Sequence, residues 1–219
     1  MNKYKYPRTP HLPMSPGVNP DDISLDTLAQ FENLEVVVTE KLDGECTTMM
    51  RDHYHARSLD SRHHPSRSAV KALWGNVRYM IPEGWRIVGE NVYAKHSIHY
   101  TDLEGYFYGF SVWNSENISL SWEETVAFLD DLNIPHVHQF YQGPYVGMDD
   151  ILNMYEIYKC EREEEGQEVE GFVMKNIDRF YYDDFGNNIA KYVRKGHVQT
   201  DEHWMHQEVI PNKLKRKGE

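Results

Sequence analysis

Residues 36–45 are Val36-Val37-Val38-Thr39-Glu40-Lys41-Leu42-Asp43-Gly44-Glu45. The β-branched run predicts a buried strand, and Gly44 ends or bends that strand. Lys41 comes at the strand end, where its amine can lie on the floor of a cleft. The ordinary pKa of a lysine amine is about 10.4, so burial and neighbouring cations must lower it before the amine can act as a nucleophile. We take Lys41 as the candidate nucleophile. The alternative is a solvated lysine beside a hairpin turn.

The composition is that of a folded globular protein. Of 219 residues, 40% are hydrophobic and 13% aromatic, which is enough to build a core and predicts a single domain over residues 1–219. Two cysteines, Cys46 and Cys160, give no disulfide framework. The chain opens without a signal-peptide pattern, and no apolar stretch approaches the roughly 20 residues that cross a bilayer. We expect a cytoplasmic protein with no membrane association.

The charge is unevenly distributed. A net charge of -12 argues against a polyanionic partner. Basic residues nevertheless outnumber acidic ones in residues 51–86 and at the C-terminal end, residues 191–217, whereas the acidity is concentrated in residues 149–170. A phosphate-rich ligand could therefore meet a basic surface on an acidic protein. The alternative is that these runs are only solvated faces.

The hydrophobic periodicity predicts a mixed α and β chain. Residues 3–20 contain five prolines and are expected to be an extended segment over the globule. The expected strands are residues 36–41, 46–51, 54–57, 85–93, 106–113, 137–141, 169–175 and 189–194. The expected helices are residues 21–32, 68–80, 121–132, 148–165 and 199–207. Residues 46–51 are expected to pair with the Lys41 strand as a hairpin. Because hairpins dominate, the predicted class is α+β with antiparallel sheets rather than a doubly wound fold.

Four short motifs follow one another in a fixed order. They are Lys41-Leu42-Asp43-Gly44, Gly89-Glu90, Glu170-Gly171-Phe172-Val173-Met174-Lys175 and Lys191-Tyr192-Val193-Arg194-Lys195. The first alone occurs by chance in about one chain in twenty of this length. The ordered set resembles the covalent nucleotidyltransferase superfamily, which comprises ATP-dependent RNA ligases, DNA ligases and mRNA capping enzymes. The aromatic strand that ends at Phe110 is similar to a further motif of that family, and the spacing from Glu90 to Phe110 is most similar to the RNA ligase 2 type.

The resemblance covers residues 36–196 and implies a fold. It implies a nucleotidyltransferase (adenylation) domain of antiparallel sheets flanked by helices, with ATP in the cleft between the sheets. Residues 197–219 are left as a C-terminal helix and a basic tail, and no separate C-terminal ligase domain is expected. The tail, residues 213–217, could supply phosphate contacts or be disordered, and we expect disorder. Substrate clamping could then need a partner protein.

The resemblance also implies roles for individual residues. The implied catalytic residues are Lys41 as nucleophile, Glu170 as ligand of Mg²⁺ (or Mn²⁺), and Lys191 at the α-phosphate. The implied nucleotide-binding residues are Glu40, Lys41, Leu42, Arg57, Glu90, Phe110, Lys175, Lys191 and Arg194. Among them, Glu90 would bind the ribose hydroxyls, Phe110 would stack on adenine, and Arg57 would lie beside the ribose and phosphate. Phe110 has the alternative of being core, and Arg62 is an alternative to Arg57.

Three positions depart from the RNA ligase 2 pattern. Asp43 is more usual in DNA ligases and capping enzymes, where RNA ligases of the second type commonly carry histidine. Cys46 stands where those RNA ligases tend to have asparagine. The second cation of the last motif is Arg194 or Lys195, and only Lys195 shares the strand face of Lys191. Two histidine pairs at helical spacing, His96 with His99 and His203 with His206, lack companion ligands, so we assign them no metal.

The implied function is that of an ATP-dependent RNA ligase acting in RNA repair. Lys41 would take AMP from ATP, the AMP would move to a 5′-phosphate end, and a 3′-hydroxyl would then form the phosphodiester. The implied partners are RNA ends, with DNA as a second option, and the implied cofactors are ATP and Mg²⁺ or Mn²⁺. The alternatives are a capping-type guanylyltransferase, a DNA ligase, and a nucleotide- or RNA-end-binding module without chemistry.

Overall fold

The computed structural model describes residues 3–59, 64–196 and 209–215. The chain divides into two compact units, and each unit is assembled from stretches that are not contiguous in the sequence. Unit 1 comprises residues 1–6, 43–136 and 199–219, and unit 2 comprises residues 7–42 and 137–198. Each unit contains its own antiparallel sheet, which agrees with the predicted α+β class. The single-domain assignment stays a prediction.

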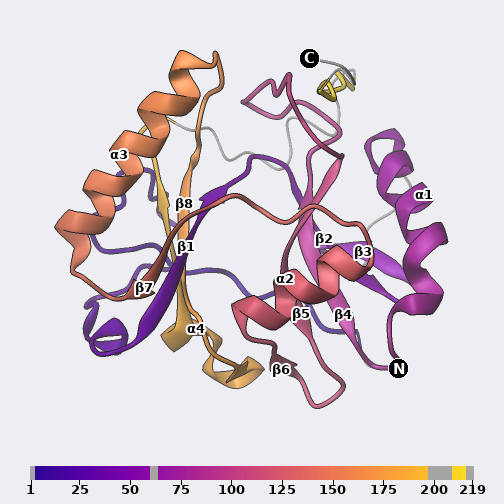
Figure 1. Ribbon diagram of the computed structural model, residues 1–219, viewed down its shortest axis with the longest axis horizontal. Coiled ribbons are helices and arrows are strands. Elements are labelled where there is room, and N and C mark those ends of the chain that lie inside the picture. The colour runs from indigo at the N-terminus through magenta and orange to yellow at the C-terminus, as the bar shows by residue number, and fades with distance from the viewer. Residues whose placement is uncertain (1–2, 60–63, 197–208, 216–219) are drawn as a thin grey trace. The chain divides into compact units, whose positions relative to one another are not determined.

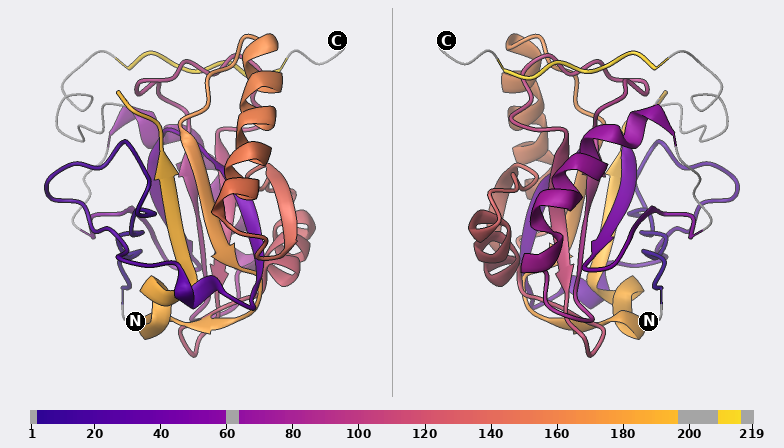
Figure 2. Two further views of the ribbon diagram at one scale, coloured as in Figure 1. Left: turned by 90° about the vertical axis from the view of Figure 1, so that its left-hand side faces the viewer. Right: turned by 90° about the vertical axis from the view of Figure 1, so that its right-hand side faces the viewer.

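Unit 2 is built on a four-stranded sheet in the order β10-β8-β1-β7. The strands are β1 (Glu35–Lys41), β7 (Gln139–Pro144), β8 (Gly171–Asn176) and β10 (Ile189–Val193). Helix α3 (Met148–Glu164) lies along one face of this sheet (Figures 1 and 2). Val36 and Val38 alternate toward that helix and are fully buried, which contributes about 1.5–3 kcal/mol per side chain. The opposite face of β1 therefore carries Lys41.

Unit 1 contains a sheet whose neighbouring strands lie in the order β3-β2-β4-β5-β6. The strands are β2 (Glu45–Met50), β3 (Tyr54–Ala56), β4 (Arg86–Asn91), β5 (Phe107–Trp113) and β6 (Ile118–Ser119). Helices α1 (Ser68–Val77) and α2 (Trp122–Asp131) pack on the sheet, and a hydrophobic core lies between the helices and the strands. The right-hand view of Figure 2 shows α1 crossing the sheet. The Ser121–Glu124 capping box starts α2, as the sequence predicts.

The remaining elements are short. They are η1 (Ala29–Phe31), η2 (Pro65–Arg67), η3 (Arg78–Met80), β9 (Phe180–Tyr181), η4 (Tyr182–Asp184) and α4 (Phe185–Asn188). The proline-rich residues 3–20 form neither helix nor strand, as predicted. Among the described residues, we find no helix with the length and hydrophobicity that crossing a bilayer would demand.

Two local predictions are wrong. Strand β2 does not form a hairpin with β1, because β1 pairs with β7 and β8 whereas β2 pairs with β3 and β4. Residues 21–32 form only the short η1 instead of a helix. The backbone of residues 23–25 is used elsewhere: Ile23 O accepts from His11 N at 2.7 Å, and Leu25 N donates to His11 O at 2.8 Å. These tertiary hydrogen bonds replace the helical ones.

The described C-terminal segment, residues 209–215, is held in unit 1 by hydrogen bonds, so the disorder expected of the basic tail is wrong for residues 213–215. Lys213 N donates to Tyr100 O at 3.0 Å, and Lys215 N donates to Leu103 O at 2.8 Å. The buried Asn212 side chain donates to Val92 O at 2.8 Å. These backbone pairings resemble strand addition, so residues 209–215 are held by hydrogen bonds that their composition does not reveal. The helix predicted at residues 199–207 lies outside the described residues.

Candidate active site

Lys41 ends β1 and forms a close ion pair with Glu170. The Lys41 Nζ atom lies 2.6 Å from Glu170 Oε2, with the lysine side chain 23% exposed and the glutamate side chain 1% exposed. The register places Lys41 opposite Gly171, so the residue preceding β8 falls beside the amine. An ideal Cβ at position 171 would be 1.9 Å from Tyr192 O, which is why glycine is needed directly after Glu170.

Lys175 and Lys191 share the sheet face of Lys41. In antiparallel strands, directly opposed residues point to the same face. Lys175 is opposite Val37 and Ile189, and Lys191 is opposite Val173. Because Val37 and Lys41 are four residues apart on β1, their side chains are also on that face. Burial lowers the pKa of Lys175 to about 8. Unit 2 thus collects three amines and one carboxylate on one side of its sheet.

Asp22 and His11 extend this cluster from the N-terminal segment. His11 forms a parallel bridge with Lys191, and Leu12 N donates to Lys191 O at 2.8 Å. Asp22 Oδ1 lies 4.0 Å from Lys191 Nζ, and Asp22 Oδ2 lies 3.3 Å from His11 Nε2. Burial, followed by the charge on Lys191, lowers the pKa of His11 to about 4. His11 is therefore neutral at pH 7, and Asp22 supplies the negative charge beside Lys191.

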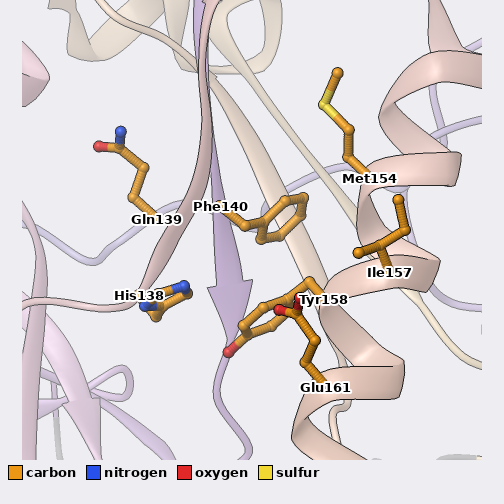
Figure 3. Close-up of a pocket in the computed structure, with 7 residues that line it drawn as sticks. All are labelled: His138, Gln139, Phe140, Met154, Ile157, Tyr158 and Glu161. Carbon is orange, nitrogen blue, oxygen red and sulfur yellow. The ribbon is translucent and has the colours of Figure 1, made fainter.

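Glu40 lies on the other face of the same sheet. The Tyr158 hydroxyl, from α3, donates to Glu40 Oε2 at 2.5 Å, and the His138 ring stacks on Tyr158 at 4.9 Å. His138 and Tyr158 line a pocket on this side of the sheet, together with α3 side chains such as Ile157 (Figure 3). The contact with Tyr158 gives Glu40 a structural role that its position next to Lys41 does not indicate.

Unit 1 brings together the residues expected for adenosine. Tyr6 is buried, and its ring meets Phe110 edge-on with centroids 5.4 Å apart. Burial raises the pKa of the Tyr6 hydroxyl, as do the charges of Cys46 and Glu90, whereas Arg57 lowers it. Phe110 therefore contacts Tyr6 of the N-terminal segment, and the charges of Glu90 and Arg57 act on the same side chain. The alternative to Arg57, Arg62, lies outside the described residues.

Asp43 fixes the loop that follows the lysine motif. Its Oδ2 atom accepts hydrogen bonds from Ser97 N, Ser97 Oγ and Ile98 N, each at 2.8 Å. Its backbone N–H donates to the Tyr100 hydroxyl at 2.8 Å. Asp43 is buried in unit 1, so this carboxylate has a structural use that is independent of substrate. The next position, Gly44, requires glycine, because a Cβ there would be 2.5 Å from Asn91 O.

Arg194 and Leu42 are the remaining residues predicted to bind the nucleotide. The Arg194 guanidinium pairs with Glu168 at 2.6 Å, while Arg194 N donates to Glu170 O at 3.0 Å. Arg194 therefore supports Glu170 through its backbone. Leu42 is buried at the end of unit 2. Lys195, the alternative second cation, is exposed.

The carboxylates of the site indicate how the implied divalent metal could be held. Among the residues that the structure describes, no three His, Cys, Asp or Glu side chains gather as a ready metal cage. Mg²⁺ is commonly held by one or two carboxylates together with substrate phosphates and water, so a single buried carboxylate, Glu170, fits such an ion. The residues present therefore fit a metal that arrives with a nucleotide.

Four residues that contact the predicted site were missed by sequence reasoning. They are Tyr6, His11, Asp22 and Tyr158. Three of them lie in the N-terminal segment, and Tyr158 lies on α3, far along the chain from Glu40. No motif marks them. The only available signal was the expectation that the proline-rich segment lies over the globule.

Two antiparallel sheets flanked by helices, with a lysine at the end of a buried strand beside a carboxylate, are the arrangement expected of a nucleotidyltransferase-type domain. Residues 34–193 match the RNA ligase family model, and the chain belongs to that family. A search of curated proteins found no match.

Solved structures share the fold at low sequence identity. An archaeal ATP-dependent RNA ligase is 17% identical with a TM-score of 0.53, and the match covers 86% of this chain and 48% of that chain. The Naegleria gruberi RNA ligase with PPi is 17% identical with a TM-score of 0.54, over 88% and 61%. A mutant of the Naegleria ligase, with ATP and Mn, is 16% identical with a TM-score of 0.52, over 76% and 51%. This chain thus spans about half the length of these ligases.

Proposed function

We propose that this chain is an ATP-dependent RNA ligase that carries AMP on Lys41. The Lys41–Glu170 pair is the observation that supports this most directly. Holding a carboxylate at 1% exposure beside an amine has a desolvation cost, and buried titratable groups with a specific charge partner are enriched at functional sites. Family membership and the fold of ATP-dependent RNA ligases point the same way.

The proposed reaction has three steps. First, the Lys41 amine, after releasing a proton to solvent, attacks the α-phosphorus of ATP; a P–N bond forms as a second proton leaves the nitrogen, and the bond to pyrophosphate breaks. Second, a 5′-phosphate oxygen of an RNA end attacks that phosphorus, the P–N bond breaks with its electron pair going to the Lys41 nitrogen, and that nitrogen takes up a proton from solvent. Third, a 3′-hydroxyl oxygen attacks the activated 5′-phosphate, its proton passes to solvent, and AMP leaves.

The residues on the Lys41 face have complementary roles in this scheme. Lys175 and Lys191 would bind phosphate oxygens and stabilise the charge that develops in the transition state. Glu170 would exchange its contact with Lys41 for a divalent cation, which supplies further charge neutralisation when bound. In unit 1, we assign ribose recognition to Glu90 and adenine stacking to Phe110, which follow the family motifs.

Intact-mass measurement tests the first step. Purified protein incubated with ATP and Mg²⁺ or Mn²⁺ should gain the mass of one AMP, and peptide mapping should place it on Lys41. Lys41→Ala should show no gain. Lys159→Ala, which removes a partly exposed lysine of the same unit, should gain AMP as the unaltered protein does. Failure of the unaltered protein to form an adduct with either metal would refute the proposal.

Two further arms separate the alternatives. An adduct with GTP but not with ATP would indicate a capping-type guanylyltransferase. ATP binding without an adduct would indicate a binding module. Gel assays with 5′-phosphorylated RNA and DNA, single-stranded and nicked, then identify the polynucleotide. We expect joining of RNA, in reactions that require both the 5′-phosphate and the 3′-hydroxyl.

A further inference from the structure

A partly exposed cluster of aromatic rings and guanidinium groups lies at the end of α1 in unit 1. We call Arg51, Trp74, Arg78 and Tyr79 the Tyr79 surface. The Arg78 guanidinium carbon is 4.2 Å from the Trp74 ring centroid and 4.9 Å from that of Tyr79. The Arg51 guanidinium carbon is 5.9 Å from the Tyr79 ring centroid. Tyr79 itself is 69% exposed, an unusually open position for a large aromatic side chain.

The surface is held in place by the core beneath it. Trp74 Nε1 donates to Met50 O at 2.7 Å, and the Trp74 ring packs on Tyr54 at 5.3 Å. Val70 and Val77 of the same helix are buried in the unit 1 core. Arg51 and Tyr79 are exposed, whereas Trp74 and Arg78 are half-buried and hold them from below, so the cluster forms a preorganised surface.

The surface is separate from the residues proposed to bind adenosine. Helix α1 packs in the core cluster that contains Ile87, whereas Glu90 lies three residues further along β4 and points to the opposite face. A ligand at the Tyr79 surface would therefore not compete with a nucleotide at Glu90. The two sites can be tested independently.

The charge of the surface selects an anionic ligand. The protein has a net charge of -12, yet within residues 3–59, 64–196 and 209–215 neither Arg51 nor Arg78 forms an ion pair with a carboxylate. Asp52, next to Arg51, instead accepts from His53 at 2.7 Å. Lys71 is exposed seven residues before Arg78, two helical turns away on the same side of α1. The cations are thus available to phosphates.

We propose that the Tyr79 surface binds single-stranded RNA, away from the ends that are joined. A base would stack on the exposed Tyr79 ring, while Arg51 and Arg78 contact the phosphates. An acidic peptide would use the charges but not the exposed ring, so RNA fits the cluster better. This inference deepens the proposed function and depends on it for the identity of the polynucleotide.

Fluorescence anisotropy with a single-stranded RNA oligonucleotide tests the inference. The oligonucleotide carries a 5′-hydroxyl and ATP is omitted, so no transfer of AMP occurs. Tyr79→Ala should weaken binding about tenfold, the typical loss of one base–aromatic stack. Arg51→Gln combined with Arg78→Gln should lower the slope of log affinity against log salt by about 1.4, because about 0.7 is lost per phosphate contact to a single strand.

Matched controls separate the Tyr79 surface from general effects. Tyr181→Ala removes a tyrosine that is 66% exposed in unit 2, and Arg8→Gln removes one exposed guanidinium there. Both should bind RNA as the unaltered protein does. Circular dichroism should show that all variants are folded, and formation of the AMP adduct should be unchanged in the Tyr79-surface variants.

Three outcomes decide the inference. Unaltered RNA affinity and salt slope in the Tyr79-surface variants would overturn it, as would an equal loss in the controls. Competition by an acidic peptide that is insensitive to Tyr79→Ala would assign the surface to a protein partner and would also overturn it. Surface-dependent RNA binding in a protein that forms no AMP adduct would support it while the proposed ligase function fails.

Discussion

Lys175→Met should stabilise the protein at pH 7 while impairing its reaction with ATP. Lys175 is 4% exposed, and burial lowers the pKa of its amine from an ordinary 10.5 to about 8. The amine is therefore still largely protonated at pH 7 in the folded protein, at a cost that corresponds to about 3 kcal/mol by the linkage between pKa and stability. Methionine fills a similar volume without the charge, so we expect an increase of up to about 3 kcal/mol in the free energy of unfolding.

The pH dependence gives this prediction its sign. Between pH 8 and pH 10.5 the unfolded chain keeps a proton on Lys175 that the folded chain releases, so the stability of the unaltered protein rises with pH. The advantage of Lys175→Met should therefore be complete below pH 8 and vanish near pH 10.5. Urea denaturation followed by far-UV circular dichroism at pH 7, 8, 9 and 10 measures the difference.

A surface lysine supplies the control for Lys175. Lys159→Met removes a partly exposed amine from the same unit and should change stability by less than about 1 kcal/mol at each pH. The AMP adduct should form more slowly in Lys175→Met and at the normal rate in Lys159→Met. A Lys175→Met protein that is less stable than the unaltered one at pH 7, or whose advantage persists at pH 10, would refute the reasoning.

Three further predictions concern stability. Because burial lowers the pKa of His11 to about 4, the unaltered protein should lose up to about 3 kcal/mol of stability as pH falls from 6.5 to 4, and His11→Asn should lack this loss in urea titrations. Gly171→Ala should lower the free energy of unfolding by about 3 kcal/mol or more, because the new Cβ meets Tyr192 O. Gly75→Ala, in open space on α1, should raise it by about 1 kcal/mol. Thermal melts that rank the two variants otherwise would contradict this prediction. Asp43→Ala should lower the free energy of unfolding by about 2–4 kcal/mol, because it leaves buried donors unpaired, and Asp43→Asn should lower it less. Equal melting temperatures for the two variants would contradict this prediction.

The periodicity of the chain was sufficient to predict most elements of secondary structure but not how the strands pair. The Val36–Val38 run, the Ser121 cap and the helical spacing of Ser68–Met80 each depend on neighbouring residues, and the structure confirms them. The predicted hairpin of β1 with β2 failed because strand pairing depends on contacts between distant segments. Residues 171–176 and 139–144 bind β1 instead.

The motif residues likewise followed from the sequence, whereas their supports did not. Lys41 and Glu170 were predicted as parts of one site, and the structure brings them to 2.6 Å. Their catalytic roles stay predictions. The hydrogen bonds that hold Asp43 and the pairing of Asp22 with Lys191 join residues far apart along the chain, and no local pattern encodes them.

The sequence by itself determined the strand that carries Lys41, the α+β class and the order of the motifs, because each depends on side-chain type and spacing over a few residues. Only the tertiary structure decided that β1 lies inside the unit 2 sheet, that Glu40 faces Tyr158 and that Arg78 and Tyr79 form an exposed surface. These features depend on which distant segments bury one another, and burial is a property of the folded chain as a whole.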